Sequence, residues 1–306
     1  FWPETVMQPI GPAAFVPIVH GCNKFCTYCI VPYRRGREKS VSIPQIRHEV
    51  EGLVAQGVRE VTLLGQTVEA YGRDLPDSPD LSDLMRDLSE IEDLWRIRYL
   101  TSYPRDMTER IIAGTAELPK ACEAFSLPVQ SGDDDVLIAM RRGYKLDLFR
   151  ERIELVRRYM PEAGISTDII VGFPGETDAQ FRNTCRLLEE LRFDKVHVAE
   201  YSPREGTIAW RTQPDDVPQA VKHERLLEVE AIHKRISEQI NARLVGTEQE
   251  ILVEGKSEGR WTGRTRTNKL VHFDGDAAPG DKVSLRIDSA TAWSLKGTPL
   301  GAPALV

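Results

Sequence analysis

Three of the five cysteines in this chain lie within eight residues, as Cys22, Cys26 and Cys29. Three thiolates this close can bind one inorganic centre if the backbone loops around it. The spacing supplies three ligands and not four, so a four-iron cubane held here would keep one iron without a protein ligand. That iron would be open to a small molecule. The pattern therefore indicates a site that does chemistry rather than one that only stores electrons.

Two other interpretations of the cysteines are open from the residues alone. Positions i, i+4 and i+7 share one helical face, so the three could be buried core cysteines. Gly21 and Asn23 disfavour a helix here, and Pro32 ends the segment soon after. Three cysteines with His20 could instead bind zinc, although zinc sites usually use C-x2-C pairs and a second pair is absent.

The motif C-x3-C-x-aromatic-C, with Tyr28 just before Cys29, resembles the signature of the radical S-adenosylmethionine (SAM) enzymes. That resemblance implies a 4Fe-4S cluster on Cys22, Cys26 and Cys29. It also implies SAM as the molecule bound at the open iron. Tyr28 could place its ring near the adenine of SAM, and packing in the core is the plain alternative.

The composition is that of an ordinary soluble protein, with 41% hydrophobic and 28% charged residues among 306. No run of about 18 apolar residues exists, so we expect no membrane span. An odd number of cysteines, three of them clustered, favours a reducing cytoplasm over a disulfide framework. The net charge of −7 means that any RNA binding must use local patches. Because the chain starts at Phe1, without an initiator methionine or a signal peptide, we expect it to be part of a longer protein.

The pattern of hydrophobic residues predicts an α/β fold. Six β/α units between residues 14 and 217 indicate a partial (β/α)6 barrel, whose chemistry should lie at the carboxyl ends of the strands. Six units rather than eight would leave that barrel partly open to a bulky substrate. Residues 1–13 are expected to form a linker, 218–243 a connecting helix and 244–306 a small antiparallel β-barrel. The expected strands of the larger barrel are 14–19, 58–64, 95–100, 122–127, 165–171 and 195–200.

Loops at the expected strand ends carry further candidate residues. Gly65 and Gln66 follow the second strand, where glycine allows close backbone approach and glutamine can both donate and accept hydrogen bonds. Gly172, Phe173 and Glu176 belong to the G-F-P-G-E loop after the fifth strand, and Glu176 could instead only cap the next helix. In radical SAM enzymes the corresponding loops hold the amino group and the adenosine of SAM, so the resemblance implies cofactor contacts here.

Further polar residues lie on or beside the strands. Asp168 lies inside the fifth strand, where its carboxylate could bind a ribose hydroxyl or could be an ordinary solvated or paired acid. Gln130 follows the fourth strand in the L-P-V-Q-S-G loop and is also expected to contact the cofactor. His197 sits in a strand and is expected to be a core histidine. Cys122 and Cys185 are isolated in the sequence and are expected to be core cysteines.

Basic residues in two places could contact nucleic acid. Arg34 and Arg35 follow the cysteines, beside the open barrel, and could bind phosphates. A second group surrounds Trp261 in the C-terminal segment and suits single-stranded RNA on a small β-barrel. In each place a solvated basic surface is the alternative. The second group comprises Lys256, Arg260, Arg264, Arg266 and Lys269.

Several stretches together resemble the methylthiotransferase family of radical SAM enzymes, among them G-C-N-K-F-C-T-Y-C, L-P-V-Q-S-G and I-V-G-F-P-G-E-T. The C-terminal segment resembles the TRAM domain, an RNA-binding module of that family. The stretches at 64–66 and 101–104 are most similar to the MiaB branch, which adds a methylthio group to isopentenyladenosine next to the tRNA anticodon. Other branches act on threonylcarbamoyladenosine in tRNA or on a ribosomal protein, and these substrates stay open.

The resemblance implies tRNA as a partner, a reductant such as flavodoxin or ferredoxin, and a monomer in the cytoplasm. Family members also carry an N-terminal domain with three more cysteines and a second 4Fe-4S cluster that handles the sulfur. No second cysteine triad occurs in these 306 residues. We therefore expect this chain to cleave SAM but not to insert sulfur by itself. A non-catalytic RNA-binding protein with a structural metal is the alternative of another class, and analysis for iron and zinc would separate the two.

Overall fold

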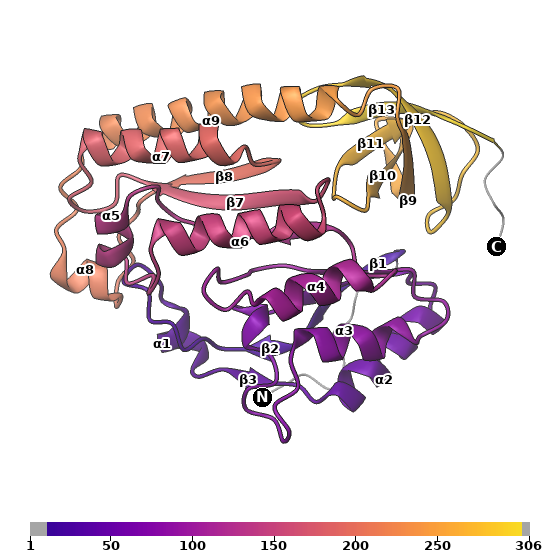
Figure 1. Ribbon diagram of the computed structural model, residues 1–306, viewed down its shortest axis with the longest axis horizontal. Helices are drawn as coiled ribbons and strands as arrows, with labels where there is room; N and C mark the ends of the chain where they lie inside the picture. Colours follow the sequence, from indigo (N-terminus) through magenta and orange to yellow (C-terminus); the bar gives the residue numbers. More distant parts are fainter. Residues whose placement is uncertain (1–10, 302–306) are drawn as a thin grey trace.

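The structure is a computed structural model that describes residues 11–301. A larger α/β domain, a long helix and a small β-barrel follow one another along the chain (Figure 1). Most of the linker expected over residues 1–13 lies outside the described residues. The order of elements confirms the fold class that the hydrophobic pattern predicts.

Six parallel strands form the centre of the larger domain. In spatial order they are β1 (Ala13–Pro17), β4 (Glu60–Leu64), β5 (Arg96–Tyr99), β6 (Ala124–Ser126), β7 (Gly164–Val171) and β8 (Lys195–Glu200). Hydrogen bonds divide them into two three-stranded sheets, with an isolated bridge between Ile97 and Ala121 where the sheets meet. Among the described strands, none pairs with the outer side of β1 or of β8. The barrel is therefore open along one side, as six units instead of eight predict.

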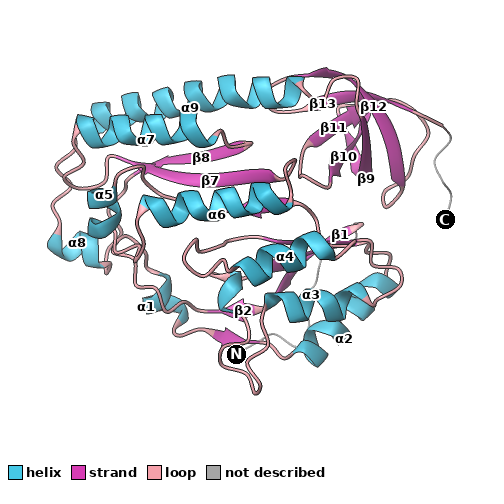
Figure 2. Cartoon of the chain, viewed as in Figure 1, coloured by secondary structure: helices cyan, strands magenta, loops and turns pink. Residues whose placement is uncertain are grey.

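Helices cover the outer faces of the two sheets (Figure 2). Each buries an apolar stripe against the strands, and several begin at a residue whose side chain caps the helix. In α7, for example, the hydroxyl of Thr177 accepts the backbone N–H of Gln180. The helices of this layer are α2 (Ile43–Ala55), α3 (Leu81–Ser89), α4 (Glu109–Glu117), α5 (Asp134–Ala139), α6 (Leu146–Tyr159) and α7 (Asp178–Leu191).

Short elements around the cysteines were not expected from the sequence. The first predicted strand, 14–19, is divided at Ile18, just after β1 ends at Pro17. Its end forms β2 (Val19–His20), which pairs antiparallel with β3 (Lys39–Ser40) and so closes the cysteine segment at its base. The other short elements are α1 (Val31–Arg35), η1 (Val68–Ala70) and α8 (Ile208–Thr212).

The small barrel follows α9 (Gln219–Ala242), which packs on α7 and β8. Its strands close in the order β10, β11, β13, β12, β9 around a separate apolar core. All neighbouring pairs are antiparallel except β11 and β13, which are parallel, so the predicted antiparallel arrangement holds for every pair but one. The strands are β9 (Glu248–Ser257), β10 (Arg260–Thr265), β11 (Leu270–Phe273), β12 (Lys282–Ala290) and β13 (Leu295–Pro299).

Two buried arginines on β5 fasten the small barrel to the larger domain. Arg98 donates from Nη1 to the carbonyl of Arg266 at 2.7 Å and from Nε to Glu60 at 2.8 Å. Arg96 donates from Nη1 to the carbonyl of Arg264 at 2.7 Å. These residues stand at the amino ends of the parallel strands. The small barrel therefore closes that end of the domain, while the carboxyl ends, where chemistry is expected, lie at the opposite end.

Candidate functional site

The cysteine loop begins just after β2, at the carboxyl end of the first barrel strand. Gly21 has a φ of +78°, and a Cβ there would overlap a neighbouring backbone carbonyl, so the position requires glycine. The N–H of Cys22 donates to the carbonyl of Gly36 at 3.1 Å, and the N–H of Cys29 donates to the carbonyl of Cys26 at 3.0 Å. The segment is a loop and not a helix, so the interpretation of three core cysteines on one helical face is wrong.

The three thiols of this loop lie close enough to act on one another. Cys22 and Cys26 are buried and Cys29 is partly buried. Burial raises the pKa of Cys22 and of Cys29, because it disfavours the thiolate form. A positively charged metal centre would reverse this penalty, because a coordinating thiol is deprotonated outright. The donor set therefore fits an iron–sulfur cluster.

A single zinc ion fits the same residues less well. Within residues 11–301, no three His, Cys, Asp or Glu side chains converge closely enough to hold one metal ion. A cubane presents a different iron to each thiolate, so its ligands stand farther apart than those of one zinc ion. His20, the fourth ligand of the zinc alternative, has an exposed side chain.

Arg142, which sequence analysis did not single out, lies beside this loop. Its Nη1 donates to the sulfur of Cys26 at 3.6 Å and to the hydroxyl of Tyr28 at 3.4 Å. Its Nη2 donates to the carbonyl of Pro128 at 2.7 Å, and its Nε to the hydroxyl of Tyr144 at 3.2 Å. The guanidinium is buried and permanently charged. It can therefore attract an anionic part of a ligand that binds at the cysteines.

A second set of polar and aromatic contacts, around Lys24 and Tyr103, holds the other side of the cysteine loop. Lys24, between the first two cysteines, forms an ion pair with Asp106 and lies 4.9 Å from the ring centroid of Tyr103. The hydroxyl of Tyr103 donates to the carbonyl of Arg142. Glu69 accepts the backbone N–H of Tyr103 at 3.0 Å, and burial raises the pKa of Glu69 to about 7. The loops after β4 and β5 therefore position the cysteine loop.

The other strand ends carry strained backbone, which is typical of ligand sites. Gln130, after β6, has a φ of +77° and is fixed by two backbone hydrogen bonds to β7. Thr101, after β5, has a φ of +71°, and Phe25 in the cysteine loop has a φ of +47°. At the end of β4, a Cβ on Gly65 would overlap the side chain of Val19. Gln66 follows it, partly exposed.

The G-F-P-G-E loop after β7 is held from within the protein. The buried carboxylate of Glu176 accepts the N–H of Gly172 at 2.7 Å and Nη1 of Arg225 from α9 at 2.9 Å. The ring of Phe173 is fully buried and packs edge-to-face on Tyr201 at 5.2 Å. The structure thus gives Glu176 and Phe173 an ion pair and core packing, where sequence analysis suggested cofactor contacts.

The sequence of this chain matches two protein-family models and several known proteins. The family model of the Radical SAM superfamily matches residues 16–188, and that of the TRAM domain matches residues 242–300. The chain is 48% identical over 297 residues to the tRNA-2-methylthio-N(6)-dimethylallyladenosine synthase of Dehalococcoides mccartyi strain CBDB1, which covers 96% of this chain and 71% of that protein. This chain belongs to that family of radical SAM proteins. The resemblance inferred from the motifs is confirmed.

Other radical SAM proteins extend the comparison. A protein of the same name from Roseiflexus sp. strain RS-1 is 46% identical, over 92% of this chain and 60% of that protein. Among solved structures, coproporphyrinogen III oxidase from Escherichia coli matches with a TM-score of 0.53 and 19% identity, over 78% of this chain and 55% of that one. At such low identity the match shows the fold alone. The family implies a 4Fe-4S cluster and SAM, which the cysteine loop can hold.

A cavity of about 620 Å³ runs through the radical SAM domain from the strands to the TRAM barrel. Ser166 and Asp168 on β7 and His197 on β8 line it, and burial raises the pKa of Asp168. His197 is exposed to this space rather than packed in the core, so the expectation of a core histidine is wrong. The reason is that β8 is an edge strand, whose alternate side chains face the open side of the barrel.

The basic residues predicted to bind RNA have different surroundings. Arg34 and Arg35 on α1 are exposed, and neither has an ion pair within the described chain. In the TRAM domain, Lys256 lies 4.4 Å from the ring centroid of Trp261. The other four form ion pairs: Arg260 with Asp274, Arg264 with Glu254, Arg266 with Glu123 and Lys269 with Asp194. Because Glu123 and Asp194 belong to the radical SAM domain, Arg266 and Lys269 face that domain.

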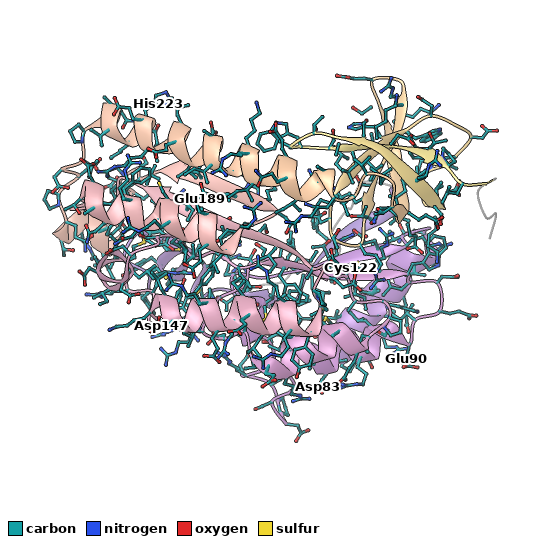
Figure 3. The ribbon with its side chains drawn as sticks, turned by 45° about the horizontal axis from the view of Figure 1, so that its top comes forward. Asp83, Glu90, Cys122, Asp147, Glu189 and His223 are labelled. Atoms are coloured by element: carbon teal, nitrogen blue, oxygen red, sulfur yellow. The ribbon has the colours of Figure 1, made fainter. Side chains whose placement is uncertain are left out.

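The two remaining cysteines are buried, as expected. Figure 3 shows Cys122 toward the TRAM end of the radical SAM domain, where Arg98 and Arg266 partly offset the rise that burial causes in its pKa. Cys185 lies on α7. Neither accompanies the cysteine loop. Over residues 11–301, no helix has the length and apolar character needed to cross a membrane.

Proposed function

We propose that this chain binds a 4Fe-4S cluster and SAM and takes part in the methylthiolation of isopentenyladenosine in tRNA. The observation that carries the proposal is the loop of three close thiols at the strand ends, with a buried arginine beside it and a large cavity within the same domain. The names of the most similar relatives support the substrate, since each is called a tRNA-2-methylthio-N(6)-dimethylallyladenosine synthase. They do not favour a ribosomal protein or threonylcarbamoyladenosine.

Different residues of the site would hold the cluster and the different parts of SAM. Cys22, Cys26 and Cys29 would hold the cluster, which supplies one electron to cleave SAM into a carbon-centred radical that can remove a hydrogen atom. Arg142 would pair with the carboxylate of SAM, because it is the buried cation next to the thiols. Gly65, Gln66, Gly172 and the left-handed Gln130 shape the strand ends at which SAM would lie. Tyr28 would contact the adenine.

The cavity would receive the target nucleoside. Its volume of about 620 Å³ lies in the range of ordinary small-molecule sites, about 300–1,000 Å³. Asp168 and His197 are paired in register on neighbouring strands and present a carboxyl and an imidazole to this space. Such groups can hydrogen-bond the edge of a base or a ribose hydroxyl. The open side between β1 and β8 would admit a nucleotide still attached to its RNA.

Sulfur insertion needs more than this cysteine loop. We infer that a second 4Fe-4S cluster supplies the sulfur and that its ligands are not among these residues, because Cys122 and Cys185 are the two cysteines of this sequence outside the loop and cannot form a second triad. We also propose a flavodoxin- or ferredoxin-type reductant, a monomer and a cytoplasmic location. Arg34 and Arg35 remain proposed phosphate contacts. In the TRAM domain, Arg266 and Lys269 face the radical SAM domain, which leaves Lys256, Arg260 and Arg264 as the residues proposed for RNA.

The test uses the chain after anaerobic reconstitution with iron and sulfide. With reductant and SAM it should release 5′-deoxyadenosine, and tRNA bearing isopentenyladenosine should bind in preference to tRNA bearing threonylcarbamoyladenosine or to ribosomal protein. Methylthiolated product from this chain alone would refute the second-cluster proposal. Failure to release 5′-deoxyadenosine would refute the function itself.

A further inference from the structure

Trp293 is the most exposed large hydrophobic residue of the TRAM domain, with 60% of its surface accessible. It lies in the turn between β12 and β13. Trp261, the aromatic residue that the sequence suggested for RNA, is different. Its ring is only partly exposed, its indole N–H donates to the carbonyl of Gly275 at 3.0 Å, and Lys256 covers it. The free aromatic surface of this domain is therefore at Trp293.

The turn that carries Trp293 is fixed by buried polar groups of α9. Ser237 donates to the carbonyl of Ala292 at 2.8 Å, and Asn241 donates to the carbonyl of Thr291 at 2.8 Å. His233, one turn earlier on the same helical face, packs edge-to-face against the indole at 5.2 Å. These contacts hold the exposed indole in one orientation. A rigid aromatic surface does favour binding, because little conformational entropy is lost when a partner arrives.

Trp293 stands at the mouth of the 620 Å³ cavity, together with Lys195 at the start of β8. Lys195 is exposed and has no ion pair within the described residues. Lys195 lines the same cavity as His233, the ring on which Trp293 packs. An exposed aromatic plane and an exposed cation thus line the same cavity, which reaches the TRAM domain.

We propose that Trp293 is a stacking platform for an unpaired base of the RNA substrate, adjacent in the RNA to the base that enters the cavity, with Lys195 contacting the phosphate between them. This inference rests on the proposed function, which supplies the RNA. Every base has a π-face, so an aromatic platform with a neighbouring cation suits single-stranded RNA of any sequence. The predicted basic group around Trp261 suits it less, because its arginines pair with carboxylates.

This arrangement gives the TRAM domain a second task. Arg96 and Arg98 fasten the TRAM domain to the radical SAM domain, and α9 fixes the turn of Trp293, which lines the cavity. A loop of RNA held at this turn would have one nucleotide on Trp293 and the next directed between β1 and β8. The platform would therefore contribute to the choice of nucleotide as well as to affinity.

The test measures the affinity of the chain for an anticodon stem-loop RNA with isopentenyladenosine in its single-stranded loop. Trp293→Ala should weaken binding about tenfold, in line with the loss of one stacked base, and Trp293→Phe should retain most of the affinity. Tyr159→Ala is the matched control, because Tyr159 is an exposed aromatic residue on the outer helix α6. Release of 5′-deoxyadenosine in the absence of RNA should be the same in all four proteins.

Two further measurements make the test specific for Trp293 and for Lys195. RNA should quench tryptophan fluorescence in the unchanged chain, and Trp293→Phe should abolish most of that quenching. Lys195→Gln should reduce the slope of log affinity against log salt concentration by about one. Equal affinity and equal quenching in Trp293→Ala and the unchanged chain would overturn the inference alone. If the unchanged chain bound no RNA at all, both the proposed function and this inference would be refuted.

Discussion

The guanidinium Nη1 of Arg142 lies 3.6 Å from the sulfur of Cys26, although 116 positions separate the two residues in the chain. The contact joins the cysteine loop to the segment after α5. It places a permanent charge where a small anionic ligand of the cluster would lie. This relationship leads to the first prediction.

Arg142→Met should weaken SAM binding by about tenfold or more, because a hydrogen bond to a charged group contributes about 1.5–3 kcal/mol. Iron content should not change, since all three cysteines remain. Both quantities can be measured on reconstituted protein, by equilibrium dialysis of SAM and by iron analysis. Arg141→Met, at the exposed neighbouring position, is the control and should bind SAM normally. Unchanged affinity in Arg142→Met would remove Arg142 from the site.

The pair of Arg225 and Glu176 should be important for stability. Only 6% of the Arg225 side chain and 1% of the Glu176 side chain is exposed. Arg225→Met leaves the Glu176 carboxylate buried without its partner and should cost about 3–5 kcal/mol of unfolding free energy. Urea denaturation would measure the loss. Arg182→Gln, which breaks an exposed pair with Glu228, should cost less than about 1 kcal/mol. Equal costs for the two substitutions would contradict this account of the loop.

Glu69 should make the stability depend on pH. Its pKa in the folded protein is about 7, above the ordinary value of 4.5, because burial disfavours the charged form. The folded state thus holds the proton more tightly than the unfolded state. This contribution to stability is complete below pH 4.5 and is lost as the pH rises through 7.

Between pH 5 and pH 8.5, Glu69 should therefore lower the unfolding free energy by about 2–3 kcal/mol. Glu69→Gln should remove this part of the pH dependence, while Glu154→Gln, at an exposed position on α6, should not. Urea denaturation at the two pH values gives the comparison. The same pH dependence with and without Glu69 would show that its carboxyl does not titrate in this range.

Arg98 should determine whether the TRAM domain stays docked. Arg98→Met removes the donors to two carbonyls of the TRAM domain and leaves Glu60 with a weaker partner. Calorimetry should then show separate unfolding of the TRAM domain, and a protease should release it. Arg286→Gln, at an exposed ion pair on β12, should keep a single transition. A single transition in Arg98→Met would mean that other contacts suffice for docking.

The sequence predicts those features of this molecule that depend on residues close together in the chain. The cysteine spacing, the glycines of the strand-end loops and the alternation of apolar periods each depend on a few neighbouring residues, and six β/α units appear as expected. Arg142 was missed because its partners come from other segments. Its neighbours Arg141 and Gly143 both have positive φ, but this irregular turn is visible only in the structure.

The basic residues of the TRAM domain show the opposite kind of error, in which a local sequence pattern suggests more than the structure supports. The cluster of basic residues over 256–269 favours an RNA surface when only the sequence is considered. In the structure Arg266 pairs with Glu123 and Lys269 with Asp194, and each partner is more than 70 positions away. Such pairs form only when the two domains dock, so no local pattern could reveal them. The exposure of Trp293 likewise follows from how its turn sits on α9.

Cys22, Cys26 and Cys29 are proposed to hold a cluster that cleaves SAM. The most direct measurement is iron content together with 5′-deoxyadenosine release, in the reconstituted chain, in Cys26→Ala and in Cys185→Ala. We predict about four irons per chain and release of 5′-deoxyadenosine for the unchanged chain and for Cys185→Ala, with both lost in Cys26→Ala. One zinc per chain, or iron and SAM cleavage retained in Cys26→Ala, would contradict the account.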